Sequence, residues 1–233
     1  MSTMEKSIYQ IKLLEKKKVA KNMLEMTFEK PTSFEFLAGQ FVQFFIPDGT
    51  KMLPRFYSVC SCPSEENLRF CIKVVEEGKG STFLSSMQKE DSLEMAGPQG
   101  RFVVGEENKP IFCVATGAGI APIMSIINNQ LDKKQNTQKI ILLFGVRSQE
   151  DIFFVNYLEK LNKYLNFSYQ ITLSRPDENG EWTGLRGRVT DHIEGDFVGH
   201  QIYLCGNATM VKDVREILIN KKVEPKQIHF EIF

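Results

Sequence analysis

The feature of this sequence that most constrains its fold is a change of hydrophobic pattern at Pro110. Before Pro110, short apolar runs are separated by turn residues, a pattern typical of antiparallel strands. After it, continuous apolar runs alternate with helical patterns, which predicts βαβ units and a parallel sheet covered on both faces. We therefore expect two domains, divided near this position.

The first pattern covers residues 1–103 and favours an antiparallel barrel or sandwich, of which we predict the β-barrel. Its expected strands are 9–14, 22–28, 40–46, 56–61, 68–74 and 92–96, with one helix at 81–88. The second pattern covers residues 104–233, begins with a polar linker at 104–109, and predicts a parallel-sheet nucleotide-binding α/β domain. Its expected strands are 111–115, 139–144, 167–173, 201–205 and 228–233, with helices at 123–131, 150–161 and 208–219.

Composition narrows the class of protein. Hydrophobic residues make up 42% of the chain, enough for packed cores. Lys plus Arg and Asp plus Glu both number 29, which argues against nucleic acid as a partner. The sequence shows no signal-peptide pattern and no apolar run near the ~20 residues of a membrane helix. The five cysteines are odd in number, lie mostly in strand-like runs and lack metal-ligand spacing, so we expect reduced thiols, no metal and a cytoplasmic protein.

A strand-like segment, Arg55-Phe56-Tyr57-Ser58, carries a cation, aromatic rings and a hydroxyl. Alternating side chains of a strand point to opposite faces, so Arg55 and Tyr57 should share a face with Ser58 at its rim. This set suits a flat cofactor with an anionic tail. An ordinary half-exposed strand would carry the same residues.

A glycine-bearing loop precedes the expected helix of the first domain. It reads Gly78-Lys79-Gly80-Ser81-Thr82 and leads into a helical start that carries two hydroxyls. Free backbone N–H groups and the helix dipole make such a start an anion site, although a Ser N-cap after a flexible turn needs no ligand. Together with Arg55 upstream, the loop favours a bound pyrophosphate.

The first strand–helix turn of the second domain reads Thr116-Gly117-Ala118-Gly119-Ile120-Ala121-Pro122. This G-x-G-x-x-P lacks the third glycine of the usual dinucleotide fingerprint, and we expect Pro122 at the first helical position. Ligands of such sheets bind at the carboxyl ends of the strands, so Gly117 and Gly119 would let backbone N–H groups approach a diphosphate.

Basic residues follow the next two expected strands. Arg147 follows the second strand, and Ser174 with Arg175 follows the third, where the ribose of a dinucleotide would lie. The alternative interpretation is that they are surface residues on loops and bind no ligand. Cys205-Gly206 ends the fourth strand. A buried structural cysteine would account for Cys205 without any role in chemistry. The apolar terminus 228–233 should dock as a last strand, because an undocked tail is rarely this apolar.

These motifs, in this order, resemble those of the ferredoxin–NADP(H) reductase superfamily, close to its single-module bacterial members. Arg55-Phe56-Tyr57-Ser58 is similar to the family's flavin-binding R-x-Y-S/T. The loop 78–82 is similar to its flavin diphosphate loop, and 116–122 to its nicotinamide-nucleotide turn. Cys205-Gly206-Asn207 with Met210 is similar to its C-G-x-x-x-M segment. The resemblance spans nearly the whole chain.

The resemblance implies roles for these residues. Tyr57 would pack on the isoalloxazine of FAD, Ser58 would hydrogen-bond at its N5, and Arg55 with Ser81 and Thr82 would hold its phosphates. Cys205 would lie beside the nicotinamide C4. Glu231 and Phe233 match a terminal E-x-aromatic that places a carboxylate near that cysteine and a ring over the flavin; plant members carry Tyr at the last position.

The implied activity is hydride transfer from NADPH or NADH to FAD, then single-electron transfer to a separate ferredoxin or flavodoxin. Ser174 and Arg175 fit a 2′-phosphate clamp and favour NADPH, whereas Pro176 stands where NADPH-specific members often carry an acidic residue. Two other enzyme functions remain as alternatives, an NAD(P)H:flavin reductase and the reductase component of an oxygenase system. A non-catalytic nucleotide-binding electron-relay subunit is the alternative of another class, and the sequence leaves the oligomeric state undetermined.

Overall fold

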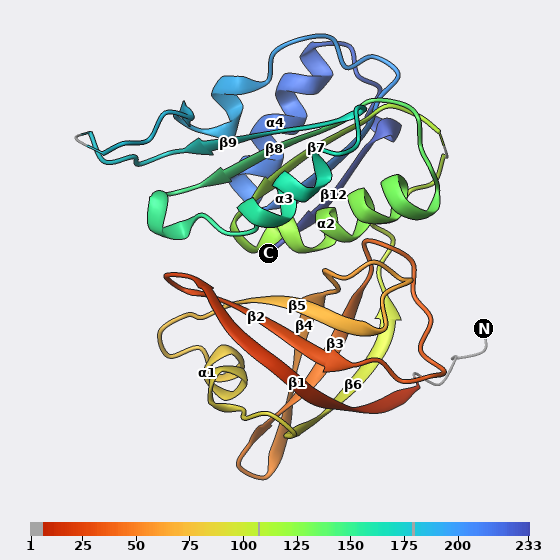
Figure 1. The fold of residues 1–233 in the computed structure, drawn as a ribbon, viewed down its shortest axis with the longest axis vertical. Coiled ribbons are helices and arrows are strands. Elements are labelled where there is room, and N and C mark those ends of the chain that lie inside the picture. The colour runs from red at the N-terminus through yellow and green to blue at the C-terminus, as the bar shows by residue number, and fades with distance from the viewer. Residues whose placement is uncertain (1–6, 107, 179) are drawn as a thin grey trace.

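The structure is a computed structural model that describes residues 7–106, 108–178 and 180–233. Residues 1–6 of the expected first domain and residue 107 of the expected linker lie outside the described residues. Figure 1 shows two bodies, a barrel formed by the first half of the chain and an α/β layer structure formed by the second, with the C-terminus at their junction.

The first half forms a six-stranded antiparallel sheet in the order β4-β3-β6-β1-β2-β5, here called the barrel domain. Its elements are β1 (Ile8–Ala20), β2 (Met23–Glu29), β3 (Phe41–Asp48), β4 (Lys51–Ser58), β5 (Asn67–Lys73), α1 (Lys79–Ser86) and β6 (Ser92–Gln99). Val59 bridges Phe70, and the Cys60 N–H donates to the Arg69 carbonyl at 2.8 Å, which joins the end of β4 to β5 and closes the sheet. The predicted antiparallel barrel is confirmed.

Alternation along the strands builds the barrel core. In β3, Val42, Phe44 and Ile46 are fully buried while the residues between them are partly exposed. The Phe44 ring lies 4.9 Å from that of Phe70 on β5, centroid to centroid, in an edge-to-face arrangement that aromatic pairs favour. The period of two predicted from the sequence therefore fixes which face of each strand points inward.

The second half forms a six-stranded parallel sheet in the order β10-β9-β8-β7-β11-β12, here called the α/β domain. Its strands are β7 (Ile111–Thr116), β8 (Ile140–Val146), β9 (Phe167–Leu173), β10 (Leu185–Arg186), β11 (Gln201–Gly206) and β12 (Ile228–Ile232). Its α-helices are α2 (Ile120–Asn128), α3 (Val155–Leu161) and α4 (Ala208–Asn220). Shorter helical segments are Gly117–Gly119, Asn129–Lys133 (a π-helix), Gln149–Asp151, Val189–His192 and Pro225–Gln227.

The chain order creates a switch point between β7 and β11. From β7 the chain moves outward through β8 to β10 on one side, and it places β11 and β12 on the other side. Ligands of open parallel sheets bind outside the carboxyl ends of the strands at such a point. The ends of β7 and β11, at Thr116 and Gly206, are therefore where the fold favours a nucleotide.

The two domains share apolar packing. Helices α2 and α3 cover the face of the parallel sheet that is turned toward the barrel, and α4 covers the opposite face. The core beneath α2 and α3 also contains Met23, Cys60 and Cys71 of the barrel domain. This buried cluster continues across the junction. The hydrophobic effect therefore stabilises the contact between the two domains in addition to the core of each domain.

Three expected boundaries are wrong in informative ways. Helix α2 begins at Ile120, so Pro122 is the third helical residue and not the first; the third N–H of a helix also lacks an internal acceptor, so proline fits. Helix α3 begins at Val155 and not at 150, because residues 149–151 form a short turn capped by the Ser148 and Asp151 side chains. Strand β4 covers Lys51–Ser58 and not 56–61.

Candidate functional site

A cavity of about 430 Å³ lies at the junction of the two domains, within the size range of small-molecule and cofactor sites. The barrel domain supplies most of its wall, and α2 and the chain terminus close it from the other side. Its lining residues are Arg55, Phe56, Tyr57, Ser58, Cys71, Lys73, Val75, Glu77, Gly78, Lys79, Gly80, Ser81, Ala118, Ala121 and Phe233. The structure thus gathers Arg55, Phe56, Tyr57, Ser58, Gly80, Ser81 and Phe233 from the sequence-predicted set around one cavity.

Arg55 and Tyr57 lie against the start of helix α1. A Cβ atom added at Gly80 would be 3.0 Å from Arg55 Cγ and 3.2 Å from the Tyr57 hydroxyl, so glycine permits this close approach. Burial raises the pKa of the Tyr57 phenol, which therefore stays neutral in the physiological range. The wall thus presents an aromatic ring and a cation side by side.

The hydroxyl of Ser81 holds the loop before α1. It accepts a hydrogen bond from the Val75 N–H at 3.1 Å and lies 3.1 Å from the Gly78 carbonyl, to which it donates. Ser81 is buried, whereas Thr82 is exposed and its N–H already bonds the Gly78 carbonyl. The groups of this loop that are able to bind an anion are therefore the backbone N–H groups at the helix start. The Ser81 hydroxyl stabilises the loop conformation that presents them.

Ser58, Glu231 and Cys205 meet from three different strands. The Ser58 hydroxyl donates to Glu231 Oε2 at 3.3 Å, and Glu231 is the direct register partner of Cys205 in the β11–β12 pair. Burial raises the pKa of Glu231 to about 7, and the Ser58 hydrogen bond only partly offsets this. Burial and the nearby Glu231 also raise the pKa of Cys205, so this thiol stays protonated. The group can hold a proton on Glu231 near neutral pH.

The last residue completes the rim. The predicted terminal strand is confirmed as β12, and the Phe233 N–H donates to the Gly206 carbonyl at 3.0 Å. The Phe233 ring lines the cavity yet is 54% exposed. An aromatic ring that is tied by its backbone and free on one face is able to move aside without disturbing the strand.

The predicted nucleotide turn packs directly on the Cys205 segment. A Cβ added at Gly119 would overlap the Cys205 carbonyl, and one added at Gly206 would overlap the Thr116 hydroxyl. Gly117 has φ +55°, in the left-handed region that favours glycine. The Thr116 hydroxyl is buried without a hydrogen-bond partner among the described residues. This glycine cradle with an unsatisfied polar atom, at the switch point of the sheet, fits a bound nicotinamide nucleotide.

The predicted basic residues lie one and two strands away from that turn. The Arg175 N–H donates to the Arg147 carbonyl at 2.7 Å, and the Ser174 N–H donates to the Val146 carbonyl at 3.0 Å. Arg147, Ser174 and Arg175 are all exposed. They form a polar, basic rim at the carboxyl ends of β8 and β9, separate from the cavity at the junction.

Sequence reasoning missed several lining residues. Cys71 and Lys73 alternate along β5 and reach the same cavity, as do Ala118 in the turn Gly117–Gly119 and Ala121 in α2. The period of two along β5 was the available signal for the first pair. Within the described residues, no group of three or more His, Cys, Asp and Glu is placed to hold a metal ion. The described helices include none that is long and apolar enough to cross a bilayer.

Comparison with known families divides the chain as the two sheets do. Residues 10–104 match the oxidoreductase FAD-binding domain, and residues 113–216 match the oxidoreductase NAD-binding domain. A ferredoxin–NADP reductase B of Sorangium cellulosum is 33% identical over 224 residues, which cover 89% of this chain and 90% of that protein. The reductase component of phenol 2-monooxygenase from a Pseudomonas strain is 29% identical over 90% of this chain.

The fold has close structural neighbours. A ferredoxin–NADP⁺ reductase from Neisseria gonorrhoeae, solved with bound FAD and NADP, superimposes with a TM-score of 0.85 at 24% identity, covering 98% of this chain and 99% of that one. Relatives from oxygenase systems are longer: the chain spans 60% of the phenol 2-monooxygenase reductase component and 63% of a naphthalene 1,2-dioxygenase reductase component.

Proposed function

The chain belongs to the ferredoxin–NADP(H) reductase superfamily, and on this premise we propose that it is a flavoprotein reductase. It takes a hydride from NADPH or NADH onto bound FAD and passes single electrons to a separate acceptor protein. The observation that carries the proposal is the meeting of Ser58, Glu231 and Cys205 where the cavity adjoins the nucleotide turn. A partly buried carboxyl with a raised pKa, beside a serine and a cysteine at a cavity rim, is typical of functional sites.

FAD would be held mainly by the barrel domain. Tyr57 offers a neutral ring for stacking, Arg55 offers a cation for phosphate, and the start of α1 at Gly80 and Ser81 offers backbone N–H groups. Thr82 follows in the same helical turn, and its exposed side chain would also face the phosphates. When bound, this cofactor exchanges one two-electron step for two one-electron steps.

The residues around Cys205 would position the nicotinamide and manage the proton. Ser58 orients the Glu231 carboxyl by donating to it, and Glu231 holds a proton at Oε near neutral pH. Cys205 remains a neutral thiol that limits the space beside the reacting ring. Phe233 covers the cavity from bulk water until the nicotinamide displaces it, a gating step of the kind that often limits turnover.

NADPH is the preferred donor in this proposal. Thr116, Gly117, Gly119, Pro122 and Gly206 would form the cradle for the nicotinamide nucleotide. Ser174 and Arg175, with Arg147 beside them, would bind the 2′-phosphate, since guanidinium forks match phosphate oxygens. These side chains are exposed and have room to close on a ligand.

The acceptor is a ferredoxin or a flavodoxin in this proposal. The curated relative named as a ferredoxin–NADP reductase supports it, because this chain covers 90% of that protein. Service to an oxygenase system is the second candidate function, and it is supported by relatives named as reductase or electron transfer components of such systems.

The decisive experiment is an anaerobic titration of the purified protein with NADPH and, separately, NADH, following flavin absorbance. Bleaching at stoichiometric NADPH, with NADH at least tenfold slower, supports both the activity and the 2′-phosphate clamp. Faster bleaching by NADH overturns the clamp and keeps the activity. Protein that purifies without flavin but reduces added FMN or riboflavin would instead be a free-flavin reductase. Bound flavin that neither nucleotide bleaches would mark a non-catalytic relay subunit.

A further inference from the structure

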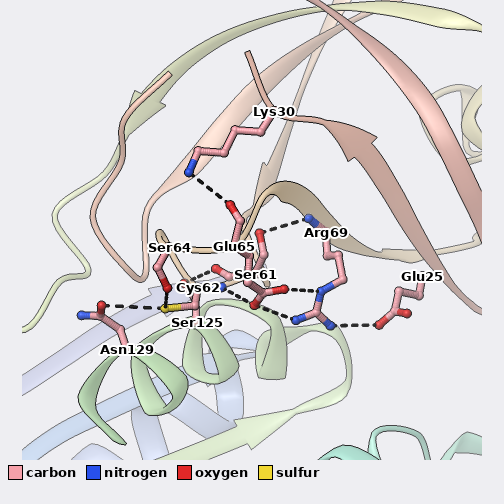
Figure 2. Close-up of polar contacts among 9 residues, drawn as sticks. All are labelled: Glu25, Lys30, Ser61, Cys62, Ser64, Glu65, Arg69, Ser125 and Asn129. Atoms are coloured by element: carbon pink, nitrogen blue, oxygen red, sulfur yellow. Dashed lines mark hydrogen bonds and ion pairs between the residues drawn. The ribbon is translucent and has the colours of Figure 1, made fainter. Parts of the chain in front are cut away.

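Arg69 is a charged side chain in an unexpected place. It lies on β5 of the barrel domain, two residues before the cavity-lining Cys71, and its side chain is only 11% exposed. Its guanidinium grips Glu65 through two hydrogen bonds, Nε to Oε2 at 3.1 Å and Nη2 to Oε1 at 3.0 Å, and pairs with Glu25 at 3.6 Å (Figure 2). Three segments of the barrel domain therefore hold one cation rigidly.

The guanidinium of Arg69 also contacts the other domain. The Arg69 Cζ atom lies 4.6 Å from the centre of the Tyr157 ring on α3, a cation–π distance. Burial raises the pKa of Tyr157 to about 12, so the ring faces Arg69 as a neutral phenol. A buried ion pair is costly to desolvate and adds little stability compared with apolar residues, which favours a role for this one in holding the Arg69 side chain in one geometry.

A second contact beside Arg69 crosses the same junction. The Ser61 hydroxyl accepts from the Arg69 backbone N–H at 3.1 Å, while the Ser61 carbonyl accepts from the Ser125 hydroxyl of α2 at 2.7 Å (Figure 2). Ser61 and Ser125 are fully buried. A polar contact of this kind in a dry junction tolerates little displacement, because a shift would leave the buried groups unpaired.

Both contacts connect directly to the reaction site. Ser61 lies three residues after Ser58, and Ser125 lies on the helix that begins at the nucleotide turn. The same short strand end thus carries a cavity residue and an interdomain anchor, and so does helix α2. A relative rotation of the domains moves the nucleotide turn against the cavity wall unless these anchors hold.

We propose that Arg69, through Tyr157 and the adjoining Ser61–Ser125 contact, is a positioning residue that fixes the α/β domain on the barrel domain in the orientation needed for hydride transfer. It touches neither cofactor. It acts by keeping the nicotinamide nucleotide bound to one domain in register with the flavin bound to the other. The kinetic part of this inference depends on the function proposed above, whereas the domain-orientation part does not.

The test replaces the partner ring and leaves the barrel's ion pairs intact. Tyr157→Leu removes the aromatic face, and Tyr157→Phe keeps it as the matched control. Tyr169→Leu, on β9, controls for loss of a partly exposed tyrosine elsewhere in the α/β domain. Since a partly desolvated cation–π contact is worth up to about 2 kcal/mol, we expect Tyr157→Leu to slow flavin reduction at saturating nucleotide by about five- to thirtyfold.

Flavin content and reduction by dithionite should be unchanged in Tyr157→Leu, and Tyr157→Phe and Tyr169→Leu should behave as wild type. The long-wavelength absorbance of the nicotinamide–flavin contact should fall in Tyr157→Leu alone. Wild-type rates and absorbance in Tyr157→Leu would overturn the kinetic claim, and so would an equal loss in Tyr157→Phe.

A second readout needs no turnover. Small-angle scattering of the protein without nucleotide should give a larger radius of gyration for Tyr157→Leu and for Ser125→Ala than for wild type. Identical scattering for all three proteins would overturn the domain-orientation claim. If Tyr157→Leu does not fold, Ser125→Ala carries both measurements, because it removes a single hydroxyl. Wild-type protein that no nicotinamide reduces would refute the proposed function while leaving the scattering test in force.

Discussion

Glu231 makes stability depend on pH in a way that one substitution should remove. Burial raises the pKa of this carboxyl from its ordinary 4.5 to about 7 in the folded protein. Between those values the folded state binds more protons than the unfolded state, so stability falls as pH rises. The stabilisation is fully present below about pH 4.5 and is lost as pH rises through about 7.

The size of the effect follows from the two pKa values. The gap between 4.5 and about 7 corresponds to about 3 kcal/mol in full, of which about 2 kcal/mol develops between about pH 5.5 and pH 8.5. Glu231 is partly exposed, so solvent screening leaves about 1 kcal/mol of this. Glu231→Gln keeps the shape and an acceptor for Ser58 but does not ionise, and it should therefore lose this pH dependence.

Thermal unfolding followed by circular dichroism measures the difference. For a chain of this size, about 1 kcal/mol moves the melting temperature by about 2–4 °C. Glu231→Gln should gain that much over wild type between about pH 5.5 and pH 8.5, whereas the exposed carboxylate variant Glu216→Gln should follow wild type throughout. Parallel curves for wild type and Glu231→Gln would refute the reasoning, because they would mean that the carboxyl is ionised across this range in the folded protein.

Three further substitutions test other parts of the site. Arg175→Ala should raise the KM for NADPH about tenfold and leave that for NADH unchanged, since a charge-assisted contact to phosphate is worth at least about 1.4 kcal/mol. Gly119→Ala should lower stability in urea by about 1–3 kcal/mol, because the new methyl group would overlap the Cys205 carbonyl. Ser81→Ala should lower the flavin content of the purified protein, because the loop before α1 loses the hydrogen bonds of the Ser81 hydroxyl to Val75 and Gly78.

Each of these has a control that the chain itself offers. Arg188→Ala also removes an exposed arginine, so an equal rise in its KM for NADPH would contradict a specific clamp. Gly105→Ala adds a methyl group where no atom lies within 4 Å, so equal destabilisation would contradict the overlap argument. Ser85→Ala removes an exposed hydroxyl bonded to the Thr82 carbonyl, and an equal loss of flavin there would make the Ser81 effect nonspecific.

Local patterns were sufficient to predict the two domains and about half of the cavity wall. Alternation along a strand places Arg55 and Tyr57 together whatever the rest of the molecule does, and both line the cavity. The apolar terminus predicted a docked strand, and Phe233 lies at the cavity rim. Repeated βαβ units imply a parallel sheet, and ligands of such sheets bind at the carboxyl ends of the strands, so the pattern placed the Thr116 turn at that edge.

Contacts that depend on how the domains sit against each other were not predictable from one sequence. Arg69 looks like an ordinary strand residue, and Tyr157 like an ordinary helix residue. Their meeting depends on the rotation of α3 and on the angle between the domains, and no residue spacing encodes either. The bond between the Ser81 hydroxyl and the Val75 N–H was not predictable for a related reason, since it depends on the path of the loop.

The junction reconciles two demands that ordinarily oppose each other. Hydride transfer requires the donor and acceptor rings to meet within a narrow distance, although each is bound by a different domain. Apolar packing alone is tolerant of sliding, because it has no direction. Arg69 and Ser125 supply directional contacts beside the cavity, while Phe233 stays free on one face. In the proposed mechanism, rigidity is thus concentrated in the contacts between domains, and the movement needed to admit the nicotinamide is left to a single terminal ring.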